Sequence, residues 1–257
     1  MPATIKDNDP GKSATGYFGN ATPMTRYSGY QTWTNLLFSH WRVPPETLQT
    51  LLPDGLMVET FDGDGWLGMV PFAMEKVRPW WFPAVPGISW FLETNLRTYV
   101  TLPDGRSGVW FFSLDATKRL AVRVARRFWN LPYFDADLSL HRDAHGIKYR
   151  GQRHGQQECS YQADMQLDNT GPLGIADEGS LEHFLLERYV LFARRPDGQI
   201  YLGRVHHTPY PFCTPRSVTV RQTLATAIGC PIESDRQPDH IAFSPGVNVS
   251  VGKLARV

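Results

Sequence analysis

Short turn signals recur along this chain between segments of alternating apolar and polar residues, and they constrain its fold most strongly. Asp-Gly pairs favour tight turns because glycine accepts positive φ angles. They occur within 62–65, 103–105 and 196–198, each between two segments of strand character. Helical periodicity is confined to three segments, which are 117–129, 180–188 and 220–228. We therefore predict an α+β fold, built on a curved or closed, barrel-like antiparallel sheet with a few helices.

The composition indicates one globular domain after a flexible N-terminal tail. The chain has 257 residues, of which 42% are hydrophobic, enough to bury a sizeable core. Residues 1–25 are polar and glycine-rich, without the apolar stretch of a secretion signal. The most apolar window, 79–92, contains three prolines and a glycine and cannot form a membrane helix. We expect a tail over 1–25, a single domain over 26–257, a cytoplasmic location and no membrane partner.

Charge and metal-ligand spacing exclude several classes of function. The net charge of +1 gives no reason to expect nucleic-acid binding. The three cysteines include no Cys-x-x-Cys pair, and the eight histidines lie scattered along the chain. His206 and His207 are adjacent, so on a strand they point to opposite faces and cannot bind one metal ion together. We therefore predict no metal and no cofactor, and we interpret His207 either as a ligand contact or as a structural histidine.

The segment 91–100 alternates strictly between two faces. Glu93, Asn95, Arg97 and Tyr99 share one face, and the other face is mostly apolar. One interpretation is a half-exposed strand whose polar face meets water, which is common in antiparallel sheets. The other is a polar face that lines a pocket, which the neighbouring Val-Trp-Phe-Phe segment favours because it is apolar on both faces. On the second interpretation the candidate ligand contacts are Asn95, Arg97, Trp110, Phe112 and His207.

A second segment, 125–134, has the sequence Ala-Arg-Arg-Phe-Trp-Asn-Leu-Pro-Tyr-Phe. It resembles the active-site segment of acetoacetate decarboxylase-like enzymes, Gly-Arg-Glu-x-x-Gly-x-Pro-Lys-Lys. The arginine and the proline are in place, and Tyr133 and Phe134 stand at the positions of the two lysines. Arg126 would lie near the end of the predicted helix, where it could either bind helix carbonyls or point into a cleft.

Further segments resemble the YqjF-like family, a domain of unknown function within the acetoacetate decarboxylase-like superfamily. They include LLPDGLMVETFDGDGWLGMVPFAM, FLETNLRTYV, VHHTPY and SPGVNV. These segments occur in order over most of the chain, from about residue 33 to residue 251. The resemblance implies an acetoacetate decarboxylase-like fold, and function does not follow from fold alone.

The resemblance also implies what the chain has lost. The decarboxylase uses a lysine amine of lowered pKa to form a Schiff base with its substrate. By motif position Tyr133 replaces that lysine, Phe134 replaces its cationic neighbour, Glu93 matches the pocket glutamate and Arg126 matches the motif arginine. The chain has only six lysines, and none lies in an apolar segment that would lower its pKa. We therefore interpret the segment as a loss of Schiff-base chemistry.

Three functional hypotheses follow from these residues. The first is an enzyme without covalent catalysis that acts on a small organic acid or carbonyl compound. In it Glu93 is the acid or base, Arg97 or Arg126 holds a carboxylate, and Tyr133 donates to an oxyanion. The second is a non-catalytic small-molecule binding protein, and the third, a decarboxylase with a displaced lysine, is disfavoured. The aromatic segment 79–91 is either a rigid loop that closes one end of the core or, alternatively, an aromatic pocket wall or a subunit contact, which leaves a homo-oligomer open.

Overall fold

The computed structural model describes residues 27–118, 131–166 and 173–257. The tail expected over 1–25 and most of the helix expected over 117–129 lie outside these residues. The described part holds one sheet of thirteen strands and three short helices, α1 (Pro45–Gln49), α3 (Leu181–Leu186) and α4 (Leu224–Ala227). The strands are β1 (Gly29–Val43), β2 (Met57–Val58), β3 (Gly65–Pro79), β4 (Phe91–Thr101), β5 (Ser107–Ala116), β6 (Tyr133–Arg142), β7 (Gly146–Arg153), β8 (Ser160–Gln166), β9 (Val190–Arg194), β10 (Ile200–His206), β11 (Ser217–Gln222), β12 (His240–Val251) and β13 (Ala255–Arg256).

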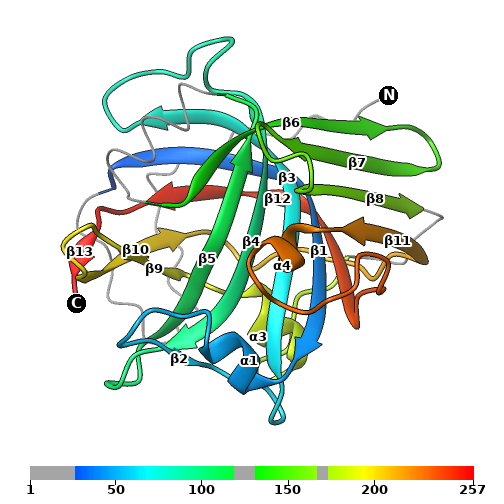
Figure 1. The fold of residues 1–257 in the computed structure, drawn as a ribbon. Helices are drawn as coiled ribbons and strands as arrows, with labels where there is room; N and C mark the ends of the chain where they lie inside the picture. The colour runs from blue at the N-terminus through cyan, green and yellow to red at the C-terminus, as the bar shows by residue number, and fades with distance from the viewer. Residues whose placement is uncertain (1–26, 119–130, 167–172) are drawn as a thin grey trace.

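Seven of the strands pair in a closed ring, and four more extend the sheet from one strand of that ring. Strands β5, β9, β10, β12, β1, β3 and β4 pair in that order, and β4 also pairs with β5. Strands β6, β7, β8 and β11 continue from β5 as a wing, which Figure 1 shows to the right of the ring. The prediction of a curved α+β sheet with few helices is confirmed.

The sheet is mixed, because β5 pairs in parallel with both β6 and β9. Parallel neighbours need a long crossover connection, and residues 117–132 provide the one between β5 and β6. The predicted turns over 103–105 and 196–198 do join antiparallel hairpins, β4–β5 and β9–β10. The turn over 62–65 does not, because β2 pairs with β4 instead of β3. Residues 220–222 belong to β11, so the predicted helix there shortens to α4.

Two large apolar cores follow from this arrangement, beside a smaller outer cluster around Phe192. The first lies inside the ring and includes Phe38, Val70 and Tyr99, with α3 contributing Leu185 at one end. The second lies between the ring and the wing and includes Tyr161. Because a strand turns alternate residues to opposite faces, each wall strand serves the inner core with one set of side chains and the outer core with the other.

The aromatic segment before β4 is only partly a core element. Trp80 and Trp81 expose 61% and 67% of their surface, whereas Phe91 is buried. The interpretation of these two tryptophans as part of a loop that closes the core is therefore wrong. A subunit contact at this segment stays a prediction.

Candidate functional site

The polar residues of β4 lie on the inner face of the ring. Glu93 pairs in register with Phe72, and Asn95 with Val70, and both partners belong to the inner core. Directly paired residues share a face of the sheet, so Glu93 and Asn95 point inward as well. Glu93 is 3% exposed, and Asn95, Arg97 and Tyr99 are buried too. The alternative of a strand with its polar face in water is therefore wrong.

Tyr133 meets Glu93 at this inner face. Tyr133 opens β6 and pairs with Leu114 of β5, which places it beside the β4–β5 ladder. Its hydroxyl donates to Oε2 of Glu93 over 2.8 Å, and its side chain is buried. Strand alternation predicted Glu93 as a site residue and motif position predicted Tyr133, and the two side chains are in direct contact.

Burial sets the protonation of this pair. Removal from water raises the pKa of Glu93 to about 8; the Tyr133 hydrogen bond opposes the rise, and the charge of Asp115 adds to it. Burial and the neighbouring Glu93 hold the pKa of Tyr133 well above its usual value. At neutral pH Glu93 is therefore mostly a neutral carboxylic acid and Tyr133 a neutral phenol. Such a pair can donate protons and hydrogen bonds to a ligand oxygen.

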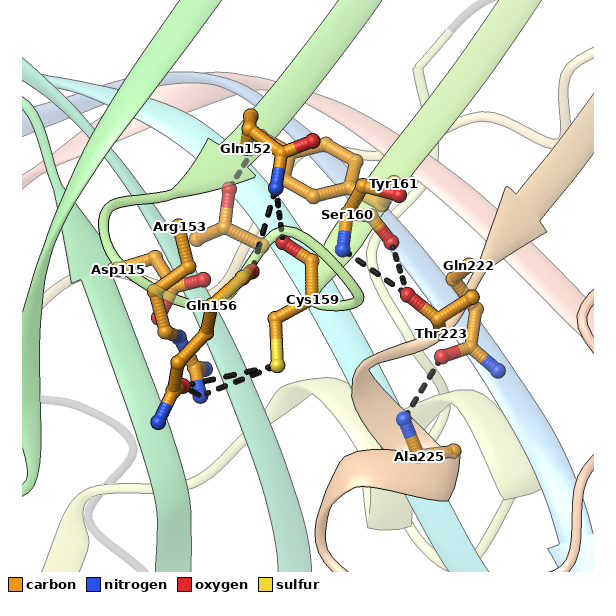
Figure 2. Close-up of polar contacts among 11 residues, drawn as sticks. Asp115, Gln152, Arg153, Gln156, Cys159, Ser160, Tyr161, Gln222, Thr223 and Ala225 are labelled. Carbon is orange, nitrogen blue, oxygen red and sulfur yellow. Dashed lines mark hydrogen bonds and ion pairs between the residues drawn. The ribbon is translucent and has the colours of Figure 1, made fainter.

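A buried ion pair lies next to Phe134, the residue after Tyr133. Arg153 at the end of β7 donates from Nε and Nη2 to Oδ1 of Asp115, over 3.1 and 2.8 Å. Its Nη1 donates to Gln156 over 3.0 Å, and Figure 2 shows these side chains together beside Cys159. The guanidinium also lies 3.9 Å from the ring centre of Phe134, the residue after Tyr133. A cation therefore packs on the aromatic ring that stands at the second lysine position.

A chain of hydrogen bonds holds Arg97 at the end of the inner face where α3 lies. Its Nη2 and the hydroxyl of Tyr99 both donate to the carbonyl of Leu185, over 3.0 and 2.8 Å. Because that carbonyl only accepts, Nε2 of His40 must donate to Tyr99 across their 2.8 Å contact. Nδ1 of His40 then accepts from Nδ1 of His240, 3.1 Å away. Burial lowers the pKa of both histidines, which fits this neutral arrangement.

Removing the hydroxyl at the centre of this chain is expected to destabilise the protein. In Tyr99→Phe the Nε2–H of His40 loses its acceptor inside the ring. An unpaired buried donor costs about 1–3 kcal/mol in the free energy of unfolding, which urea denaturation would measure. Tyr30→Phe is the matched control, because the Tyr30 hydroxyl makes no hydrogen bond to a described residue. Equal stability of the two variants would contradict the deduced chain.

Several buried polar atoms at the inner face, Nε1 of Trp66 among them, lack a hydrogen-bond partner within the described residues. Three of these atoms belong to predicted site residues, and they are Oδ1 of Asn95, Nε of Arg97 and Nε2 of His207. His207 packs between Tyr189 and Tyr210, and its Nδ1 donates to the Thr208 carbonyl over 2.8 Å. Burial lowers the pKa of His207 to about 4, so Nε2 is an acceptor at neutral pH. Buried polar atoms are nearly always satisfied, so one donor and two acceptors are available to a ligand.

The other predicted site residues do not join this group. Strand alternation turns Val109 and Phe111 of β5 inward, so Trp110 and Phe112 face outward. Trp110 packs in an outer cluster around Phe192, and Phe112 packs in the core beneath the wing. Arg126 lies outside the described residues. No group of three or more metal-ligating side chains occurs within the described part.

An open surface groove has Tyr133 in its wall. Its volume is about 610 Å³, and its described lining residues come from the start of β6, the two residues before it and the β9–β10 turn. Tyr133 therefore belongs both to the inner contact with Glu93 and to the groove. The remaining lining residues are Leu131, Pro132, Phe134, Arg194, Arg195, Pro196 and Gly198.

The amino-acid sequence matches a known protein family over most of its length. The model of the DUF2071 family, an uncharacterized conserved protein, matches residues 30–248. The uncharacterized protein YqjF of Bacillus subtilis (strain 168) is 39% identical over 180 residues, which are 70% of this chain and 73% of that protein. No helix of the described part is long and apolar enough to cross a membrane.

Solved structures with similar folds are acetoacetate decarboxylase-like. The acetoacetate decarboxylase of Legionella pneumophila superposes with a TM-score of 0.66 at 15% identity, covering 96% of this chain and 98% of that one. An acetoacetate decarboxylase-like enzyme from Sphingomonas wittichii RW1 gives 0.65 at 16% identity, covering 95% and 100%. The enduracididine biosynthesis enzyme MppR, solved with pyruvate, gives 0.60 at 13% identity, covering 94% and 98%. The chain therefore belongs to the DUF2071, YqjF-like family and has the acetoacetate decarboxylase-like fold.

Proposed function

We propose that this protein binds a small organic acid or carbonyl compound inside the ring and acts on it without forming a Schiff base. The observation that carries the proposal is the 2.8 Å hydrogen bond between Tyr133, at the motif position of the lysine, and the buried Glu93. A neutral acid and a neutral phenol in contact can donate to a carbonyl oxygen as negative charge develops there.

The roles divide between two parts of the inner face. Glu93 is the proton donor, through the carboxyl oxygen that does not accept from Tyr133. Tyr133 holds the Glu93 carboxyl group in place with its O–H. Nε of Arg97 holds the carboxylate of the ligand, because a guanidinium binds carboxylates through its N–H groups. Oδ1 of Asn95 and Nε2 of His207 accept from a hydroxyl of the ligand. The part of Arg126, like the cytoplasmic location and the homo-oligomeric state, stays a prediction.

The lysines of the described part support chemistry without a Schiff base. Lys76, Lys148 and Lys253 are exposed, and Lys118 is half-buried. A Schiff-base lysine needs an environment that lowers its pKa, such as an apolar pocket or a neighbouring cation. Pyruvate bound to MppR adds support for a short 2-oxo acid as the ligand class.

Isothermal titration with 2-oxopentanoate tests the binding part of the proposal. We expect the wild type and Glu93→Gln to bind, because the glutamine amide still donates an N–H to the ligand. Tyr133→Phe should bind about tenfold or more weakly, because it removes the hydrogen bond that orients the Glu93 carboxyl group. Tyr30→Phe is the control and should bind like the wild type. Failure of the wild type to bind, or equal affinity of Tyr133→Phe and the wild type, would contradict the proposal.

Proton exchange separates an enzyme from a binding protein. When Glu93 gives its proton to the carbonyl oxygen, the carboxylate that remains takes a proton from C3 and the enol forms. Reversal of this step after exchange with solvent should replace the C3 hydrogens of bound 2-oxopentanoate with deuterium in D₂O, which ¹H NMR follows. The exchange should be lost in Glu93→Gln. Binding without exchange would favour the second candidate, a non-catalytic binding protein, for which a neutral Glu93–Tyr133 pair serves equally well. Borohydride treatment with the 2-oxo acid should leave the intact mass unchanged, and a covalent adduct would restore the displaced-lysine hypothesis.

A further inference from the structure

Near the groove, strand β5 of the ring changes its parallel neighbour from β9 to β6. Strand β5 pairs with β9 at Val109 and Trp110, and it pairs with β6 only from Leu114 onward. The β9–β10 turn and the segment before Tyr133 therefore meet across the intervening part of β5, and they line the groove together. A β-bulge at Phe112 disturbs β5 at the same place. The groove is thus built by the topology of the sheet.

Arg195 follows β9 on the inner side of this wall. Leu191 and Ala193 belong to the inner core, and by alternation Arg195 falls on their side. Its guanidinium lies 4.0 Å from the ring centre of Tyr201, which pairs with Ala193. The aromatic ring holds the guanidinium in place without using its N–H groups, which leaves them available to bind an anion.

The described lining of the groove carries positive charge. Arg194 and Arg195 both belong to it, and the described lining residues include no aspartate or glutamate. Asp197 lies at the tip of the same turn, where it accepts the backbone N–H of Gln199. Nε of Arg195 is buried and has no hydrogen-bond partner among the described residues. It shares this property with Nε of Arg97 inside the ring.

We infer that the groove admits the ligand and that Arg195 binds a second anionic group, so that the ligand is a short dicarboxylate instead of a monocarboxylate. The inference rests on the proposed function, because Arg97 holds the first carboxylate. Two guanidinium groups, each with an unpaired buried Nε, call for two separate acceptors. Tyr133 lines the groove and contacts Glu93, so the ligand's carbonyl reaches the pair while its second carboxylate stays at Arg195.

Two C5 2-oxo acids that differ only in the terminal group test this inference. We expect 2-oxoglutarate to bind the wild type about tenfold tighter than 2-oxopentanoate in isothermal titration, since it adds one charge-assisted contact. Arg195→Gln should weaken 2-oxoglutarate to the level of 2-oxopentanoate and leave 2-oxopentanoate within about twofold. Arg195→Lys, which keeps the charge but loses the Nε donor, should fall between the two. Arg221→Gln, at an exposed position of β11, is the matched control and should change neither affinity.

The outcomes separate this inference from the proposed function. If both acids bind the wild type equally, or if Arg195→Gln weakens both by the same factor, the second anion site is wrong while the interior site stands. If neither acid binds, the proposed function fails and the inference fails with it. A circular dichroism spectrum like that of the wild type would show that Arg195→Gln is folded, and Arg195→Lys repeats the comparison with a milder change.

Discussion

Replacing Arg153 with methionine is expected to lower the free energy of unfolding by about 3–5 kcal/mol. Arg153 and Asp115 are 5% and 2% exposed, and the two guanidinium bonds to Oδ1 of Asp115 compensate for the burial of both charges. Methionine keeps much of the volume but leaves the carboxylate of Asp115 buried without its cation. Urea denaturation at neutral pH measures the loss.

A salt bridge on the same strand provides the control. Arg150 pairs with Asp164 over 2.7 Å, but the two side chains are 38% and 47% exposed. Exposed pairs contribute about 0–1 kcal/mol, so Arg150→Met should change stability by no more than that. Equal losses in the two variants would show that the buried pair has no special part in stability.

The pH dependence of the Arg153 variant should identify the unpaired carboxylate as the cause. Burial raises the pKa of Asp115, and Arg153 opposes this rise. Without Arg153 the rise is larger, so the native state holds a proton that the unfolded state releases. The destabilisation should therefore be small at acidic pH and grow as the pH rises. Adding Asp115→Asn should recover part of the loss at neutral pH, because the neutral amide needs no cation.

Local patterns predict two of the hairpins, because each of these turns is encoded within a few residues. The turns over 103–105 and 196–198 join paired strands, where Gly105 and Gly198 adopt φ angles of 85° and 83°. Local patterns could not predict the two parallel pairings of β5, because the partner strands β6 and β9 follow only after long connections. The same limit explains β2, which passes over the adjacent β3 to pair with β4.

In the candidate site, too, local patterns predicted some residues, and contacts between distant segments determined the others. Strand alternation indicated the inner face of Glu93, Asn95 and Arg97, and the motif position indicated Tyr133, so these residues were within reach of the sequence. Alternation alone cannot say which face is inward, and Trp110 and Phe112 were therefore assigned to the wrong one.

Contacts between distant segments left no local signal. His40 and His240 are 200 residues apart and meet only because β1 pairs with β12. Arg153 reaches Asp115 from the wing, and Arg195 is an ordinary turn-flanking arginine in the sequence. A partner from a distant segment distinguishes His40 and Arg153 from surface residues, and a buried Nε distinguishes Arg195.

Glu93→Gln is expected to stabilise the protein by an amount that grows with pH. Burial raises the pKa of Glu93 from 4.5 to about 8, so between these values the native state holds a proton that the unfolded state has released. The stability that the neutral acid contributes is fully present below about pH 4.5 and is lost as the pH rises through 8. Glutamine imitates the neutral acid and can still accept from Tyr133, so the variant does not suffer this loss.

The difference in unfolding free energy between Glu93→Gln and the wild type should be near zero at about pH 4.5 and reach on the order of 5 kcal/mol at pH 9. Urea denaturation at pH 5, 7 and 9 measures it. The titration of His207, whose pKa burial lowers to about 4, occurs in both proteins and cancels in the difference. Glu233→Gln, at an exposed position, should give a flat difference. A flat profile for Glu93→Gln would mean that Glu93 is ionised in the native protein, and an ionised Glu93 could not donate the proton that the proposed chemistry requires.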